Sequence, residues 1–213
     1  MHHAHQHAQT RTRELRQRLA HEAARLMAES GIRDYHQAKL KAAERLGIQD
    51  DASLPRNSEI EDALRQYQRL FGGDSHARAV RMRRDAALEA LEFFSRFHPR
   101  LVGPVLDGTA DENSPVHLHL HSDDPDAVML FLEDQRIPAD PHTRRVRLDR
   151  ERRADFPVWV FNAQDLTIDL TVLPLDALRQ APLSGFDEKP MKRASLVQLR
   201  QLLVDGETAG YDR

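Results

Sequence analysis

The first half of the chain carries apolar residues at helical spacing. Leu15, Leu19, Ala23 and Leu26 recur every three to four residues, and Gly31 stands where a C-terminal cap would fall. Three more helices are expected: one from Asp34 to Gly47, one opened by a Ser58 and Glu61 capping pair and ended by Gly72-Gly73, and one from Asp74 to Pro99. These patterns therefore predict a helical bundle over residues 1–98.

A period of two takes over after Pro99. Strands are expected at 101–106, 116–121, 146–148, 158–161 and 166–173. Helices are expected after Asp124-Pro125 and over 195–204, where Ser195 and Gln198 form a capping pair. The pattern predicts an α+β protein with a helical region over 1–98 and a small α/β domain over 99–213.

Composition narrows the class of protein. The 213 residues are 40% hydrophobic, enough to bury a core, and no apolar run approaches the roughly 18 residues that a membrane span needs. The chain has no cysteine, which excludes disulfides and thiol chemistry. The His-rich start, residues 1–9, lacks the apolar stretch of a secretory signal and is expected to be a disordered tail. We therefore expect a soluble, cytoplasmic protein with no membrane partner.

Charge is nearly balanced, with 31 Lys and Arg against 34 Asp and Glu. Residues 1–98 carry 17 basic and 14 acidic side chains, and the remainder carries 14 and 20. Neither half predicts a strongly basic nucleic-acid surface. The densest basic cluster, Arg78, Arg81, Arg83 and Arg84, is interpreted as a solvated helix face, with a phosphate-binding patch as the alternative.

One segment carries a family resemblance. Residues 103–120 read Gly-Pro-Val-Leu-Asp-Gly-Thr-Ala-Asp-Glu-Asn-Ser-Pro-Val-His-Leu-His-Leu. This is similar to the signature of the nucleotidyltransferase fold of the DNA polymerase β-like superfamily. In that family a strand ends in Gly-Ser, a second glycine follows five positions after the first, and Ser-Asp-x-Asp begins the next strand. Gly103 and Gly108 match the glycines, and Ala110 and Ser114 match the flanking small residues.

The resemblance covers residues 90–175 and implies a mixed sheet. The strands containing Val102, Leu118 and Leu170 should lie in that sheet, with the helix over 128–132 packed on it. Gly103, Gly108 and Ser114 would then bind nucleotide. The third carboxylate of the family would fall on Asp169.

The functional positions are where the chain departs from the family. Pro104 replaces the nucleotide-contacting serine, and Pro115 and His117 replace two metal-binding aspartates. Two-metal phosphoryl transfer needs hard oxygen ligands, which proline and histidine do not supply. The ordinary magnesium-dependent reaction is therefore expected to be lost, and Asp169 is the remaining catalytic candidate. Without the resemblance, the two glycines mark only a turn at the end of a strand.

A row of histidines marks the strand over 116–121. Alternation places His117, His119 and His121 on one face, and two imidazoles two residues apart can chelate one metal with a carboxylate from Asp169. The alternative is a polar, partly exposed sheet face, and this interpretation is preferred. A divalent metal is thus possible but not favoured, and no other cofactor is indicated.

The leading hypothesis is a catalytically degenerate nucleotidyltransferase-like protein that binds a nucleotide, an RNA end or a protein partner. One alternative is an active nucleotidyltransferase with an altered metal site at His117, His119 and Asp169. Another is a non-enzymatic helical interaction or regulatory module whose α/β half is purely structural.

Overall fold

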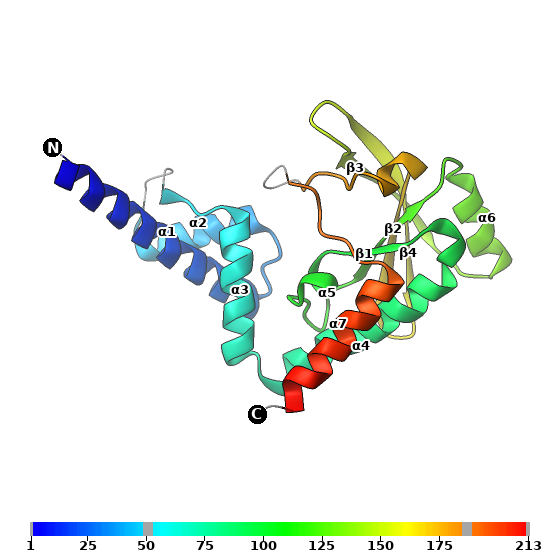
Figure 1. Cartoon of the computed structure of the whole chain (residues 1–213), viewed down its shortest axis with the longest axis horizontal. Helices are drawn as coiled ribbons and strands as arrows, with labels where there is room; N and C mark the ends of the chain where they lie inside the picture. The colour runs from blue at the N-terminus through cyan, green and yellow to red at the C-terminus, as the bar shows by residue number, and fades with distance from the viewer. Residues whose placement is uncertain (1, 49–52, 185–188, 212–213) are drawn as a thin grey trace. The chain divides into compact units, whose positions relative to one another are not determined.

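The chain forms two compact units, Met1–Gly73 and Asp74–Arg213. The computed structural model describes residues 2–48, 53–184 and 189–211 (Figure 1). Over these residues the fold is mixed, with helices and a five-stranded sheet. No helix within the described ranges has both the length and the apolar content needed to cross a membrane.

The first unit packs three helices: α1 (His2–Ser30), α2 (Tyr35–Leu46) and α3 (Asn57–Phe71). Its core is built largely from small residues, including Ala23 and Ala38 at 0% exposure, which lets the helices approach closely. The expected caps of α2 are confirmed: Asp34 accepts a hydrogen bond from the Gln37 N–H at 2.7 Å, and Gly47 takes the left-handed conformation at φ 66°.

Two details of this unit differ from the sequence analysis. The backbone of residues 2–9 belongs to α1, where a disordered tail was expected, since neither Pro nor Gly interrupts residues 2–30. Helix α3 begins at Asn57, and its first turn is closed by Glu59, whose carboxylate accepts from the Arg56 N–H at 2.7 Å. The expected pair of Ser58 and Glu61 is therefore not the cap.

The second unit alternates helices and strands. In chain order they are α4 (Gly73–Phe93), the 3₁₀ turn η2 (Ser95–Phe97), β1 (Arg100–Val102), α5 (Pro104–Asp107), β2 (Val116–His121), α6 (Asp126–Asp134), β3 (Asp140–Arg147), β4 (Arg153–Ala163), β5 (Leu166–Leu173), the 3₁₀ turn η3 (Leu175–Leu178) and α7 (Leu196–Tyr211). The bounds of β2 and β5 are those predicted. The Ser195 and Gln198 capping pair of α7 is also confirmed.

The strands form one sheet in the order β1-β2-β5-β4-β3. Strand β2 runs parallel to β5, and the other neighbours are antiparallel. The strands of Val102, Leu118 and Leu170 therefore share one mixed sheet, as expected. Val128 and Leu132 of α6 belong to the same buried cluster as Leu118 and Leu170, which confirms that this helix packs on the sheet.

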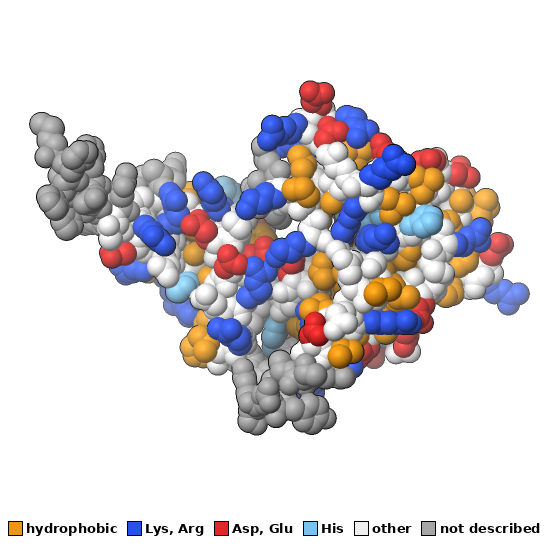
Figure 2. Space-filling view, viewed as in Figure 1, with side chains coloured by type: hydrophobic (Ala, Val, Ile, Leu, Met, Phe, Trp, Pro, Cys, Tyr) orange, Lys and Arg blue, Asp and Glu red, His pale blue; other side chains and the backbone are white. Residues whose placement is uncertain are grey.

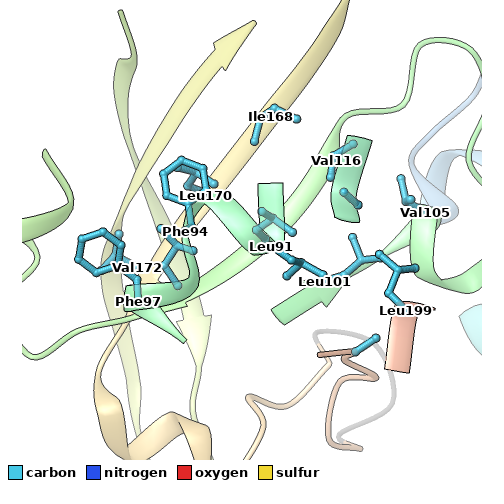
Figure 3. Close-up of a cluster of buried hydrophobic side chains, with 14 of the residues drawn as sticks. Leu91, Phe94, Phe97, Leu101, Val105, Val116, Ile168, Leu170, Val172 and Leu199 are labelled. Carbon is cyan, nitrogen blue, oxygen red and sulfur yellow. The ribbon is translucent and has the colours of Figure 1, made fainter. Parts of the chain in front are cut away.

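The larger hydrophobic cluster of this unit lies on one face of the sheet, and a smaller one that includes Val146 and Leu173 lies on the other. Leu91 of α4, Phe94 just after it and Leu199 of α7 belong to one buried cluster with Leu170 of β5 (Figure 3). Helix α4 thus belongs to the core of the α/β unit, and the boundary between units lies at Gly73. This division differs from the expected boundary at residue 98, because the broad apolar face of α4 packs on the sheet.

Three strands differ from the prediction. Strand β4 covers Arg153–Ala163, where a strand over 158–161 is expected. The expected strand over 101–106 stops at Val102, because Gly103 takes a φ of 74° and Pro104 begins the short helix α5. Proline fits the first position of a helix and cannot donate to a strand ladder. Strand β3 covers eight residues, Asp140–Arg147, where a strand over 146–148 is expected. Its first residues are mostly polar and exposed, so they show no apolar alternation.

Candidate functional site

The second face of the sheet carries polar residues, and we call six of them the polar face: His117, His119 and His121 of β2, Asp169 and Thr171 of β5, and Arg144 of β3. Alternation along β2 and β5 separates them from the leucines of the core. His119, His121, Asp169 and Thr171 are each less than 9% exposed. Buried polar side chains need partners, so their contacts determine what this face can do.

Arg144 and Asp169 form the centre of the polar face. The guanidinium donates from Nη1 to Asp169 Oδ1 at 2.9 Å and from Nη2 to Oδ2 at 2.8 Å. Nη1 also donates to Thr171 Oγ1 at 2.8 Å. Arg144 lies on β3 and Asp169 on β5, so the side chain reaches across β4. Such a forked pair is among the stronger charged contacts in proteins.

His117 lies directly beside Asp169. The two residues are register partners on β2 and β5, and His117 Nδ1 is 3.3 Å from Asp169 Oδ2. Burial alone would raise the pKa of Asp169, but its contacts with His117 and Arg144 outweigh burial and hold that pKa well below its ordinary value. Asp169 is therefore a carboxylate at any physiological pH.

The other two histidines of the face are buried as neutral rings. Burial is the largest cause that lowers the pKa of His119, to about 3, with smaller contributions from His121 and Arg144. Burial likewise lowers the pKa of His121 to about 4. His121 Nδ1 lies 2.8 Å from the carbonyl of His98, which makes it the protonated nitrogen. Its Nε2 has no hydrogen-bond partner in the described part of the chain.

The metal set suggested by the sequence is only partly assembled. His117 and Asp169 meet, and His119 follows on the same face, but the guanidinium of Arg144 already holds both oxygens of Asp169. Among the side chains that the structure describes, no three from His, Cys, Asp or Glu are placed so that they could hold a metal ion. A cation on Asp169 would have to displace Arg144.

The two glycines of the family-like motif lie in a turn next to the polar face. We call residues 103–114 the glycine turn. Gly103 and Gly108 flank α5, and both need positive φ, at 74° and 77°. A Cβ on Gly103 would come within 3.5 Å of Cδ2 of His117, so the main chain of the turn lies against the imidazole.

Helix α4 holds the glycine turn by its carbonyl oxygens. Arg83 is 2% exposed and donates to the carbonyls of Ser114, at 2.8 Å, and Glu112. Arg84 donates to the carbonyls of Val105 and Leu106 at 3.1 and 3.2 Å.

His76 adds a third contact of this kind, because its Nε2 lies 3.1 Å from the carbonyl of Gly108. Three side chains of one helix thus bind five carbonyls of the turn.

Ser114, expected to contact nucleotide, is engaged within the turn itself. Its hydroxyl donates to Asp111 Oδ1 at 2.7 Å and accepts from the Asp111 N–H at 3.0 Å. In this structure its observed role is to close the loop before β2.

Sequence reasoning missed the arginines of this site. Arg83 and Arg84 were interpreted as a solvated helix face, yet both side chains bind the glycine turn. A signal was present for Arg83, which falls on the same helical stripe as the buried Val80 and Ala87. Arg144 gave no comparable signal. On the face shown in Figure 2, Lys and Arg side chains lie among Asp and Glu side chains, so charge alone does not mark the site.

Comparison with known proteins adds no family. No protein-family model matches the chain, and no curated protein sequence matches it.

Proposed function

We propose that the unit Asp74–Arg213 is a catalytically degenerate nucleotidyltransferase-like domain that binds a nucleotide between the glycine turn and the polar face. The observation that carries the proposal is the register of β2 and β5, which pairs His117 with Asp169 while Gly103 lies against the same imidazole. The resemblance implies this neighbourhood, because these are the positions of its second and third carboxylates and its first glycine.

The order of elements gives further support. A helix, a strand ended by Gly103, a turn, a strand, a helix and then strands follow one another in the order that the resemblance implies. The unusual φ of Gly103 and Gly108 explains why glycine is needed at both positions. A simple strand-ending turn would not require the first glycine to approach His117.

The loss of magnesium chemistry follows from the donors present. Pro115 offers no ligand, His117 offers a nitrogen, and Asp169 is paired with a guanidinium. Magnesium prefers several oxygen ligands in octahedral geometry. The alternative of an active enzyme with a His and Asp metal site requires Arg144 to leave both oxygens of Asp169, so we favour binding over transfer.

A thermal-shift screen tests the proposal. The four ribonucleoside triphosphates are added with EDTA or with magnesium, and a ligand at 100 times its Kd should stabilise the fold by about 2.7 kcal/mol. The variant Gly103→Ala should lose the shift. Gly206→Ala is the matched control, because a Cβ there meets nothing within 4 Å.

Two outcomes would contradict the proposal. Magnesium-dependent transfer from a nucleoside triphosphate, abolished by Asp169→Ala, would favour the active enzyme. Absence of a shift with every nucleotide at millimolar concentration would favour a purely structural α/β unit.

A further inference from the structure

The donors of Arg144 are only partly used by the protein. A guanidinium has five N–H groups. Two on Nη1 and one on Nη2 account for the bonds to Asp169 and Thr171. For the Nε–H and the second Nη2–H of Arg144, the described residues supply no acceptor. These two groups lie along one edge of the planar guanidinium.

That edge suits an oxyanion. Parallel N–H groups on one edge of a guanidinium match the oxygens of a phosphate or carboxylate. The Arg144 side chain is 41% exposed, whereas Asp169 is 9% exposed, so solvent reaches the arginine rather than the carboxylate. An anion can therefore approach Arg144 without displacing Asp169.

The surrounding charges also favour an anion. Asp169 is the one carboxylate among the six residues of the polar face, and Asp140 of β3 is a second carboxylate in register with it across β4. The two buried histidines are neutral. The positive charges of Arg100 and Arg193 both act on His121 and help to lower its pKa after burial, the main cause. The three guanidinium groups of Arg100, Arg144 and Arg193 thus outnumber the two carboxylates of Asp140 and Asp169 on this side of the sheet.

We infer that Arg144 takes the place of a metal ion: it neutralises Asp169 with one edge and binds a phosphate group of the ligand with the other. The inference rests on the proposed function, which supplies the nucleotide as ligand. It adds that the phosphate group is what Arg144 recognises and that binding needs no divalent cation. The ligand class is a phosphate or polyphosphate ester.

Calorimetric titration in EDTA tests the inference. A nucleoside triphosphate, its nucleoside and inorganic triphosphate are titrated into the full chain and into Arg144→Lys. Lysine keeps the charge but loses the fork, so binding of both phosphate compounds should weaken at least about tenfold. Arg145→Gln is the matched control, because Arg145 lies on the opposite face of β3 and is 70% exposed; it should bind as the unaltered chain does.

A second variant separates this role from a structural one. Asp169→Asn removes the negative charge next to the anion, so phosphate binding should be kept or tightened. A purely structural pair would weaken binding in both variants, and a magnesium site would lose it in Asp169→Asn. Either of those results would overturn the inference. Circular dichroism confirms that each variant is folded. If Asp169→Asn unfolds, the nucleoside decides: Arg144→Lys should weaken both phosphate compounds and leave nucleoside binding unchanged, and an equal loss for all three ligands would overturn the inference.

The results also separate this inference from the proposed function. Nucleotide binding that needs magnesium, or that survives Arg144→Lys unchanged, overturns the inference and leaves the proposed function in place. Arg144-dependent binding of inorganic triphosphate without any nucleotide preference supports the inference and counts against the proposed function. If nothing binds at millimolar concentration, both fail.

Discussion

Strand β2 sends Leu118 and Leu120 to one face of the sheet and His119 and His121 to the other, and all four side chains are buried. The leucines join a continuous cluster with α4, α6 and α7. The histidines are buried as neutral rings among arginines, and one of them keeps an unpartnered nitrogen. The leucine face of β2 therefore stabilises the fold, whereas its histidine face places buried polar groups in the sheet.

The comparison teaches where function is to be sought. Burying leucine is favourable by itself, whereas burying imidazole and carboxylate costs free energy unless each polar group is paired. A fold that needed only stability would gain from apolar residues at those positions. The polar face is thus the part of the sheet that stability does not explain.

The largest effect is expected on the apolar face. Leu118→Ala should lower the free energy of unfolding by about 2–5 kcal/mol, because it leaves a cavity in the close-packed cluster. Urea denaturation measures the change. Val197→Ala is the control, since Val197 is 73% exposed on α7 and should change stability by less than about 0.5 kcal/mol. Equal losses in both variants would contradict the assignment of the core.

Acid should weaken the fold through the buried histidines. In the unfolded chain they take up protons near pH 6.5, whereas in the folded chain the pKa of His119 is about 3 and that of His121 about 4. The free energy of unfolding is therefore highest above pH 6.5 and falls as the pH drops toward 4. For the two histidines together, the loss between pH 7 and pH 5 should be roughly 4 kcal/mol. Asp169 does not oppose this, since its lowered pKa acts only below the ordinary value of 3.8.

Urea denaturation at pH 7, 6 and 5 measures this loss. The double variant His119→Gln and His121→Gln should flatten the dependence. A dependence as steep as that of the unaltered chain would show that other groups are responsible.

The hydrogen bonds from Arg83 to the glycine turn should contribute somewhat less to the free energy of unfolding. Arg83→Met keeps the apolar stem but leaves the carbonyls of Glu112 and Ser114 without their donor, so we expect a loss of about 2–3 kcal/mol. Hydrogen exchange should quicken at residues 105–114. The control Arg81→Met removes an exposed pair with Asp85 and should cost under about 1 kcal/mol. Unchanged hydrogen exchange in Arg83→Met would contradict the conclusion that Arg83 holds the glycine turn in place.

The smallest effect is expected at the rim of the polar face. The His117 side chain is 27% exposed, so His117→Ala should change the free energy of unfolding by less than about 1 kcal/mol while weakening nucleotide binding. Denaturation and calorimetry on the same sample separate the two quantities. A large loss of stability would place His117 in the structural core instead.

Local patterns in the sequence were enough to predict much of the fold. Strict alternation gave the bounds of β2 and β5, and a cap with a left-handed glycine gave those of α2. The contact of His117 with Asp169 followed from the family resemblance. These features depend on a few neighbouring residues or on one motif.

The remainder depends on contacts between distant segments. Arg144 meets Asp169 only because β3 lies two strands from β5, an order that alternation does not reveal. The burial of Arg83 depends on carbonyls of a turn about 30 residues later, as its bonds to Glu112 and Ser114 show. A charged residue on an apolar helix stripe was the one clue that the sequence offered to such a contact.

A crystal structure with a bound nucleoside triphosphate, grown in magnesium, tests the central claim most directly. We predict a phosphate oxygen within hydrogen-bond distance of Arg144 Nε and Nη2, with the bonds from Arg144 to Asp169 intact. A magnesium ion between Asp169 and the phosphates, with Arg144 turned away, would contradict the account.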